Sequence, residues 1–363
     1  MNGRSFPLCP RAKCSILNTI FDCKYEPGDF QNDSTLGEKY FEYYQNAVGN
    51  CRAHSTTDSH RKILDLVSLL KQPTATKSST ESTLAKKLPD DELDDSDDII
   101  QDSINLAVRL LVMMPTGVFI TRGRSVTVSG DTKLNWNEGT ITDLITNELA
   151  PENHMREAVK LEKIFNARNI ERIAGIEIRW TSNLADHMRM RDDDTAAEIF
   201  HYASFLELHR TCEIPLLEWQ VKTLRNQAKP IIPSALISET FQTLALLLPE
   251  HDKDVENWFR KQENLARKRG ALPLDPLARE CGQLKVEERQ IGKFNYWHDR
   301  LVILKTVFDE AEPRNITQWW HDRRKRVQWY TFWVAAMVLG LTIFFGLVQC
   351  IEGGIQVWYA AHA

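Results

Sequence analysis

Three consecutive acidic residues, Asp192-Asp193-Asp194, have the spacing in this 363-residue chain that best suits metal-assisted chemistry. Carboxylates two positions apart on a turn, here Asp192 and Asp194, can hold a divalent cation against a diphosphate, because hard cations prefer oxygen ligands. The alternative is a solvated turn whose negative charge favours the positive end of a helix beginning near Thr195. Because the turn requires no ligand, we predict no cofactor and no bound metal, and keep Asp192 and Asp194 as candidates.

Three histidines near this turn form a second group of chemically active side chains: His187, His201 and His209. The last two are eight positions apart and would share one face of a helix, where they could act as metal ligands or acid–base groups. Scattered histidines more often lie on a helix surface or in a packed core. We therefore expect a structural role for all three.

Sequence motifs of the common enzyme chemistries are missing. The chain contains no G-x-x-x-x-G-K-[ST], no G-x-G-x-x-G, no G-x-S-x-G and no H-E-x-x-H. Its seven cysteines include no C-x-x-C pair, and the offsets between Cys9, Cys14 and Cys23 match no usual zinc pattern. We expect reduced thiols, and the sequence leaves enzymatic activity open while favouring a non-enzymatic role.

The predicted fold class is mainly α, with a small β component near residues 115–180 and a single C-terminal transmembrane helix. Strand-like patterns occur at Gly117–Thr121, Ser125–Ser129 and Gly175–Trp180. Helical patterns cover Pro151–Asn166 and, after Asp192, five further segments: Thr195–Arg210, Pro215–Asn226, Ser234–Leu248, Asp252–Arg269 and Asp275–Phe308. In the last segment an apolar series steps by three and four residues: Phe294, Trp297, Leu301, Leu304 and Phe308. The series lasts about two heptads, which favours packing within the domain over a coiled coil.

Composition divides the part of the chain before the membrane segment. Residues 1–70 are predicted to be partly ordered, and residues 99–312 to form an α-rich domain. Residues 71–98 are Ser/Thr-rich and then acidic, with four basic and eight acidic residues and a net charge of −4. Self-repulsion and a lack of apolar groups predict a disordered linker there. A calcium loop is the alternative, but the turn glycine and the ligand spacing that it needs are missing.

The segment Trp329–Ile351 contains 23 residues and no charge. A helix of that length spans about 35 Å, against about 30 Å for the hydrocarbon core of a bilayer. Its eleven Leu, Ile, Val and Phe residues contribute roughly −3 to −6 kcal/mol to membrane insertion. We predict a transmembrane helix with these anchoring residues: Trp329, Tyr330, Trp333, Phe344, Phe345 and Ile351.

The flanks of this segment predict its orientation. The short tail at 352–363 has no Lys or Arg, whereas the juxtamembrane segment 313–328 carries a basic cluster: Arg323, Arg324, Lys325 and Arg326. Positive charge marks the cytosolic side, so we expect a cytosolic N-terminal domain and contact of the cluster with anionic lipid headgroups. The late span, without a secretory signal at the N-terminus, predicts a tail-anchored protein. The endoplasmic reticulum, or a membrane downstream of it such as the plasma membrane, is the expected location.

Four stretches of the chain resemble a known group of proteins: Ile178–Met190, Ile199–Leu206, Gln318–Arg324 and Trp329–Val334. They are similar to filamentous-fungal proteins of unknown function that end in one transmembrane helix. The likeness covers roughly residues 100–360. It implies a C-terminal anchor, and it implies no activity, cofactor or site residue.

Net charge is mild, at 45 − 50 = −5, so no nucleic-acid partner is expected. The leading hypothesis is a tail-anchored protein whose cytosolic domain is a non-enzymatic interaction or scaffold module, with the bilayer and other proteins as partners. The alternative is a membrane-anchored enzyme that depends on metal through Asp192 and Asp194. Ala336 and Gly340 form a small-xxx-small pair, which allows a homo-oligomer.

Overall fold

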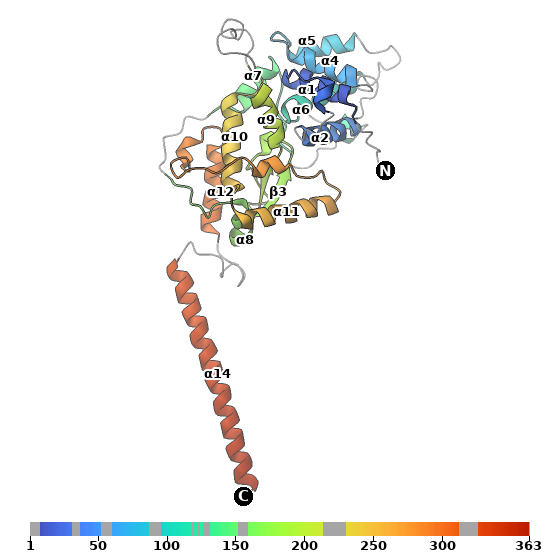
Figure 1. The fold of residues 1–363 in the computed structure, drawn as a ribbon. Coiled ribbons are helices and arrows are strands. Elements are labelled where there is room, and N and C mark those ends of the chain that lie inside the picture. Colours follow the sequence, from blue (N-terminus) through green and yellow to red (C-terminus); the bar gives the residue numbers. More distant parts are fainter. Residues whose placement is uncertain are drawn as a thin grey trace.

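A computed structural model describes residues 8–30, 37–51, 60–86, 96–117, 120–121, 124–125, 131–151, 159–212, 230–311 and 326–362. The protein is mostly helical. Its N-terminal part, residues 8–311, contains a small sheet, and one long C-terminal helix extends away from this part (Figure 1). This confirms the predicted fold class. Buried apolar side chains of the N-terminal part form one continuous core, which includes residues as distant in sequence as Ile16 and Phe308.

Helices from the first hundred residues pack around one long helix, α6. Their bounds are α1 Pro10–Phe21, α2 Glu38–Gly49, α4 His60–Leu70, α5 Lys77–Ala85 and α6 Ser96–Val112. Each of the first four contacts α6, and the Tyr40 hydroxyl donates to the Leu110 carbonyl at 2.5 Å, which ties α2 to α6. Since α1 and α2 also contact α9, Ala203–Cys212, the first 70 residues share their core with the rest of the protein.

The predicted disordered linker at 71–98 is wrong for its first half. Helix α5 lies within it and packs on α6 through the buried Thr80 and Leu84. Its start is fixed by a capping box, in which Thr76 and Ser79 satisfy each other's backbone N–H groups. The acidic end of the segment also has a helical role, because Asp97 and Asp98 lie in the first turn of α6, where negative charge is favourable. Residues 87–95 lie outside the described residues.

A three-stranded sheet lies in the second half of the core, with β3 Glu177–Thr181, β4 Met190–Arg191 and β5 Ala196–Phe200 in the order β3–β5–β4. Strand β3 runs parallel to β5, and β4 runs antiparallel to it. The helix predicted over Thr195–Arg210 is therefore wrong in its first part. Four of the five residues of β5 are buried, as expected for a central strand, so they lack the polar alternation that marks a strand in sequence. Two further strands of two residues each, β1 Ile120–Thr121 and β2 Arg124–Ser125, pair antiparallel apart from this sheet.

The remaining helices of this half are α7 Ile141–Glu148, α8 Ala167–Ala174, α10 Ser234–Leu247, α11 Lys253–Lys268 and α12 His298–Glu310. Helix α8 contacts β3, and α12 contacts β4. The long helix predicted over Asp275–Phe308 is wrong before His298, where two short 3-10 turns interrupt the chain (Pro276–Arg279 and Ile291–Lys293). The apolar series from Phe294 to Phe308 is buried in the domain, as predicted. The helix predicted over Pro151–Asn166 is wrong for residues 159–166, where Lys160 bridges Gln290. The segment 215–226 lies outside the described residues.

Cys23 departs from the expected reduced state. Cys23 is disulfide-bonded, whereas Cys9, Cys14, Cys281 and Cys350 are free thiols. Burial raises the pKa of the Cys281 thiol to about 12, so this thiol stays protonated and unreactive.

Glu239 of α10 fixes the start of α12. Its carboxylate accepts three backbone N–H groups, those of Asn295, Tyr296 and Trp297, each at 2.8 Å. These groups directly precede the first residue of α12, so the side chain caps the helix from another element. Burial still raises the pKa of Glu239, even though the three donors act in the opposite direction.

We expect the Glu239→Ala variant to lose about 3 kcal/mol of unfolding free energy, because it removes the acceptor of three N–H groups, of which that of Trp297 is buried. Urea denaturation in detergent micelles, followed by circular dichroism, measures this loss. The matched Glu239→Gln variant keeps one acceptor oxygen and is expected to lose about half as much. Equal stability of the alanine variant and the wild type would show that the cap is dispensable.

Candidate functional site

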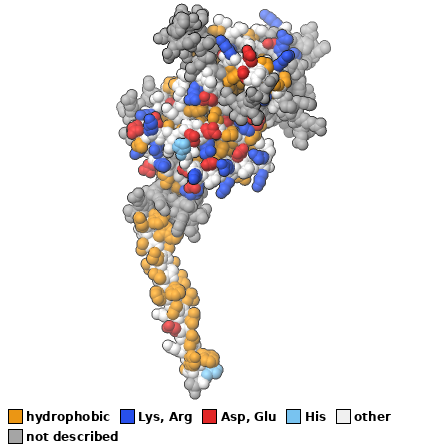
Figure 2. All heavy atoms as spheres, in the orientation of Figure 1, with side chains coloured by type: hydrophobic (Ala, Val, Ile, Leu, Met, Phe, Trp, Pro, Cys, Tyr) orange, Lys and Arg blue, Asp and Glu red, His pale blue; other side chains and the backbone are white. Residues whose placement is uncertain are grey.

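The C-terminal helix α14, Arg326–His362, is the largest apolar surface on the described protein. Its 37 residues correspond to about 55 Å, longer than the roughly 40–45 Å of a whole bilayer. None of its most apolar window is buried against the rest of the described chain, and Figure 2 shows hydrophobic side chains along most of its length. It is the one helix among the described residues that is long and apolar enough to cross a membrane.

The predicted anchoring residues lie on this helix. Four of them are exposed: Tyr330 63%, Phe344 59%, Phe345 58% and Ile351 62%. Trp329 and Trp333 lie near the start of the helix with their ring centroids 6.2 Å apart. Trp358 lies 29 residues after Trp329, about 43 Å along the axis. Aromatic residues at this separation match the two interfaces of a bilayer. In the basic cluster, Arg326 is the first residue of α14, and Arg323, Arg324 and Lys325 lie outside the described residues.

The acidic candidates Asp192 and Asp194 lie in the turn that connects β4 to β5, not at the start of a helix. All three aspartates of the turn have positive φ angles, of 51°, 52° and 63°, which is the left-handed region that short polar residues tolerate best. The Asp192 carboxylate pairs with Arg179 of β3 at 2.6 Å. Within the described ranges, no three His, Cys, Asp or Glu side chains come together as metal ligands.

His187 and His209 are buried. His187 is held at both ring nitrogens: Nδ1 accepts from the Phe200 N–H at 3.2 Å, and Nε2 lies 2.8 Å from the Thr243 hydroxyl. His209 packs against the rings of Phe21 and Phe205. Burial lowers the pKa of each to about 3, so both rings are neutral at physiological pH. Neither ring has the solvent access that proton exchange with a substrate would need.

A buried ionic cluster, missed by the sequence reasoning, surrounds Asp186. This fully buried carboxylate accepts from the Thr132 N–H at 3.0 Å, the Asn183 side chain at 2.6 Å and Arg191 at 3.1 Å. Arg191 also pairs with Glu198 of β5 at 2.9 Å, and burial raises the pKa of Glu198. Because protein groups occupy the acceptor positions of Asp186, the cluster joins the 131–136 segment to the sheet and offers little room for a ligand. The sequence signal that could have revealed this cluster is the pair of cations three and five positions after Asp186, Arg189 and Arg191.

A cavity of about 330 Å³ lies along β3 and beside the C-terminal half of α11. Its polar lining includes Arg179, Ser182, Gln262 and Arg269, and its apolar lining includes Leu265. This volume is at the lower limit for a small-molecule or peptide pocket. His201 also lines it: the ring is 95% buried (5% exposed), and its Nδ1 accepts from the Asp275 N–H at 3.2 Å.

The tautomer of His201 follows from this contact. Burial lowers the pKa of His201 to about 3, so the ring is neutral. Since Nδ1 is an acceptor, the proton lies on Nε2. Nε2 has no hydrogen-bond partner in the described part of the chain, and it is not among the polar atoms sealed from solvent. The cavity therefore contains a neutral N–H donor in a fixed orientation.

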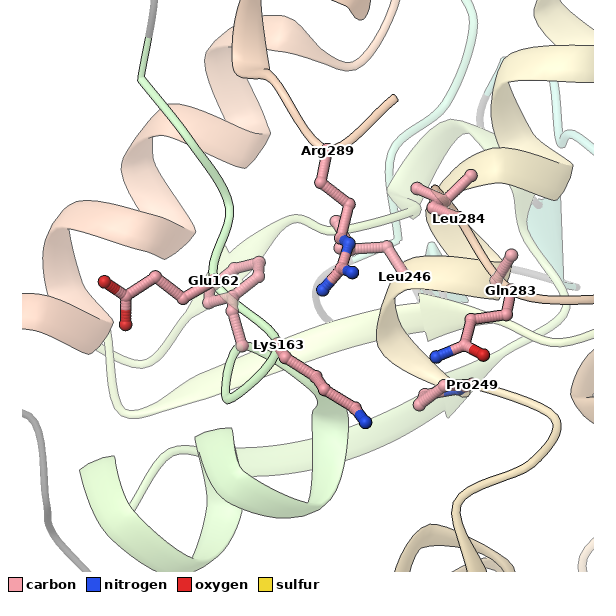
Figure 3. Close-up of a pocket in the computed structure, with 9 residues that line it drawn as sticks. Glu162, Lys163, Leu246, Pro249, Gln283, Leu284 and Arg289 are labelled. Atoms are coloured by element: carbon pink, nitrogen blue, oxygen red, sulfur yellow. The ribbon is translucent and has the colours of Figure 1, made fainter. Parts of the chain in front are cut away.

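Another cavity, between the end of α10 and the segments that precede α8 and α12, is much smaller (Figure 3). Its volume is about 20 Å³, which is enough for one water molecule. Lys163 and Arg289 line it, and the Nε of Arg289 is buried without a partner in the described structure. In Figure 3 the Glu162 carboxylate points away from both cations. The size of this cavity excludes a metabolite.

Comparisons of the chain with protein-family models, with curated proteins and with solved structures find no match. The fold and the described surfaces define a class of protein: a mostly helical protein with one candidate membrane-spanning helix near its C-terminus.

Proposed function

We propose that this protein is a single-pass, tail-anchored membrane protein whose N-terminal domain is a non-enzymatic interaction or scaffold module. The exposed apolar surface of α14 carries the proposal, because an apolar helix of that length whose most apolar window is not buried in the described chain is costly in water and stable in lipid. The domain is compact and shares one core, so the anchor would hold a folded unit at the membrane. The proposed partners are the bilayer, its anionic headgroups and other proteins, and small residues on α14 also permit a homo-oligomer.

The proposed orientation places the domain in the cytosol, at the endoplasmic reticulum or a membrane downstream. Four cations before the apolar segment Trp329–Ile351, and none among residues 352–363, support this orientation. The disulfide at Cys23 opposes it, because disulfides are rare in the cytosol. Because these two observations disagree, the orientation of the chain in the membrane is the property to measure first.

A non-enzymatic role is supported by what the reactive side chains of the domain contact. His187 and Asp186 are occupied by protein groups, and Asp192 is paired with Arg179. The described residues provide no observation that favours the metal-dependent alternative through Asp192 and Asp194, so we propose no second function.

The proposed orientation predicts the glycosylation of the chain in microsomes. Two natural acceptor sequences, Asn32-Asp-Ser and Asn315-Ile-Thr, precede the helix, and we expect both to remain unmodified. An acceptor tag appended after Ala363 is expected to receive a glycan, because it would lie in the lumen. Gel mobility with and without endoglycosidase measures both results.

A glycan on Asn32 together with an unmodified tag would reverse the orientation and place the Cys23 disulfide in an oxidising compartment. An Asn32→Gln variant identifies the modified site in that case. A chain that is extracted from the microsomes by alkaline carbonate would contradict the membrane anchor itself.

A further inference from the structure

Strand β3 is an edge strand whose outer side is open in the described structure. It pairs only with β5, with Glu177 beside Ala196, and the Glu177 N–H donates to the Thr195 carbonyl at 2.8 Å. In a parallel pair, alternate residues point their backbone groups to the same neighbour. The N–H and C=O groups of Ile178 and Trp180 therefore point away from β5, and the described chain supplies no backbone partner for either N–H on that side.

The 330 Å³ cavity runs along this outer edge. Its lining includes Glu177 and Arg179, whose side chains lie on one face of the sheet, and also Ile178 and Trp180, whose side chains lie on the other. A cavity over one face would contact only every second residue. The opposite wall is formed by α11 and the segment that follows it, so the cavity is a groove between an edge strand and a helix.

The chemistry of the groove suits an extended peptide with apolar and acidic side chains. Backbone groups of β3 supply donors and acceptors, and the Nε2–H of His201 is a further donor suited to a peptide carbonyl. Leu265 is 42% exposed on the helix wall. Arg269 at the end of α11 is exposed and has no ion-pair partner within the described ranges, whereas Arg179 is already paired with Glu177 and Asp192.

We propose that the groove between β3 and α11 binds an extended segment of a partner protein, which adds as a fourth strand to the outer edge of β3 and places an acidic side chain against Arg269. This inference deepens the proposed scaffold role and depends on it. Main-chain hydrogen bonds to Ile178 and Trp180 would supply affinity, and the apolar wall with Arg269 would supply specificity.

The test uses the full-length protein in phosphatidylcholine nanodiscs. A random heptapeptide library is selected against it, and the enriched peptides are synthesised and titrated by fluorescence anisotropy. We expect an alternating apolar sequence with an acidic residue, and at least tenfold weaker binding to the Arg269→Glu variant. The Leu265→Asp variant is expected to lose a similar factor. Lys261→Glu is the matched control, because Lys261 is an exposed cation of the same helix that does not line the groove, and its affinity should stay within twofold of the wild type.

Amide hydrogen exchange resolved to single residues tests the geometry. In the free protein the amides of Ile178 and Trp180 are expected to exchange faster than those of Glu177 and Arg179, and a bound peptide should slow the first two. The proposal is overturned if no peptide is enriched, if binding ignores Arg269→Glu, or if the edge amides are already slow. Protection of the edge by phosphatidylserine nanodiscs without peptide would instead assign the groove to a lipid surface. Failure of the chain to enter nanodiscs would contradict the proposed membrane anchor. This outcome is distinguishable from failure of the groove proposal, in which the chain enters nanodiscs but binds no peptide.

Discussion

The double variant Leu341→Arg, Phe345→Arg is expected to move the full-length protein from the membrane fraction to the soluble fraction or to aggregates. Each arginine near the middle of a membrane helix costs about 2.5–3.5 kcal/mol, and each replaced apolar residue gives up roughly another 0.5 kcal/mol. Together the two changes cost about 6–8 kcal/mol. This exceeds the roughly 3–6 kcal/mol that the apolar residues of the span contribute to insertion.

Both side chains are exposed on α14, at 49% for Leu341 and 58% for Phe345, so the substitutions leave the core of the domain intact. Ultracentrifugation of cell membranes after carbonate treatment measures the partition. The matched variant Leu341→Ala, Phe345→Ala keeps an uncharged span and is expected to remain in the membrane pellet. A double-arginine variant that stays in the pellet, folded and resistant to carbonate, would show that α14 is not what holds the protein there.

The parts of the fold that the sequence predicts correctly are those with long, one-sided periodicity. Helices α10 and α11 lie close to their expected bounds, because their apolar periodicity is long and their end residues are recognisable, such as Asp252 before α11. The C-terminal helix is predicted from hydropathy alone, because its apolar residues occur on all of its sides. Its extension through Gly353-Gly354 differs from expectation.

The incorrect predictions share one physical cause, which is tertiary pairing that the local pattern does not contain. Strand β5 has the sequence AAEIF, which suits a helix or a strand equally and is decided by its two neighbouring strands. Helix α5 is polar and becomes ordered through its cap and its contact with α6. The groove was equally hidden, because Trp180, His201 and Arg269 are brought together only by the sheet and the return of α11.

Stability is expected to fall steeply as the pH decreases from about 6.5. The buried rings of His187, His201 and His209 each have a pKa near 3 in the folded protein because burial disfavours their charged form. Unfolded histidine titrates near 6.5. Between these values the unfolded chain binds more protons than the folded one, by up to three, so the unfolding free energy decreases by about 4 kcal/mol per pH unit at most. Above pH 6.5 the three rings are neutral in both states, and their contribution is complete and constant.

Buried carboxyl groups act in the opposite direction and reduce this slope. Burial raises the pKa of Asp131 and Asp275, as it does for Glu198 and Glu239. As the pH falls, these groups bind protons in the folded protein before they do so in the unfolded chain, which stabilises the fold. Their opposing effect begins at their raised pKa values in the folded protein and is complete below the ordinary carboxyl pKa values of the unfolded chain. The measured slope is therefore the difference between the histidine and carboxyl contributions.

Urea denaturation of the full chain in micelles at pH 7, 6 and 5 measures the slope, and a His209→Leu variant tests its origin. This variant removes one titrating ring in contact with Phe21 and Phe205 and replaces it with an apolar side chain. We expect the slope between pH 6 and 5 to decrease by about one third, as one of three protons is lost from the balance. His251→Gln is the control, because His251 is exposed, and it should leave the slope unchanged. A wild-type midpoint that is constant from pH 7 to 5 would mean that the three rings are accessible to protons in the folded state.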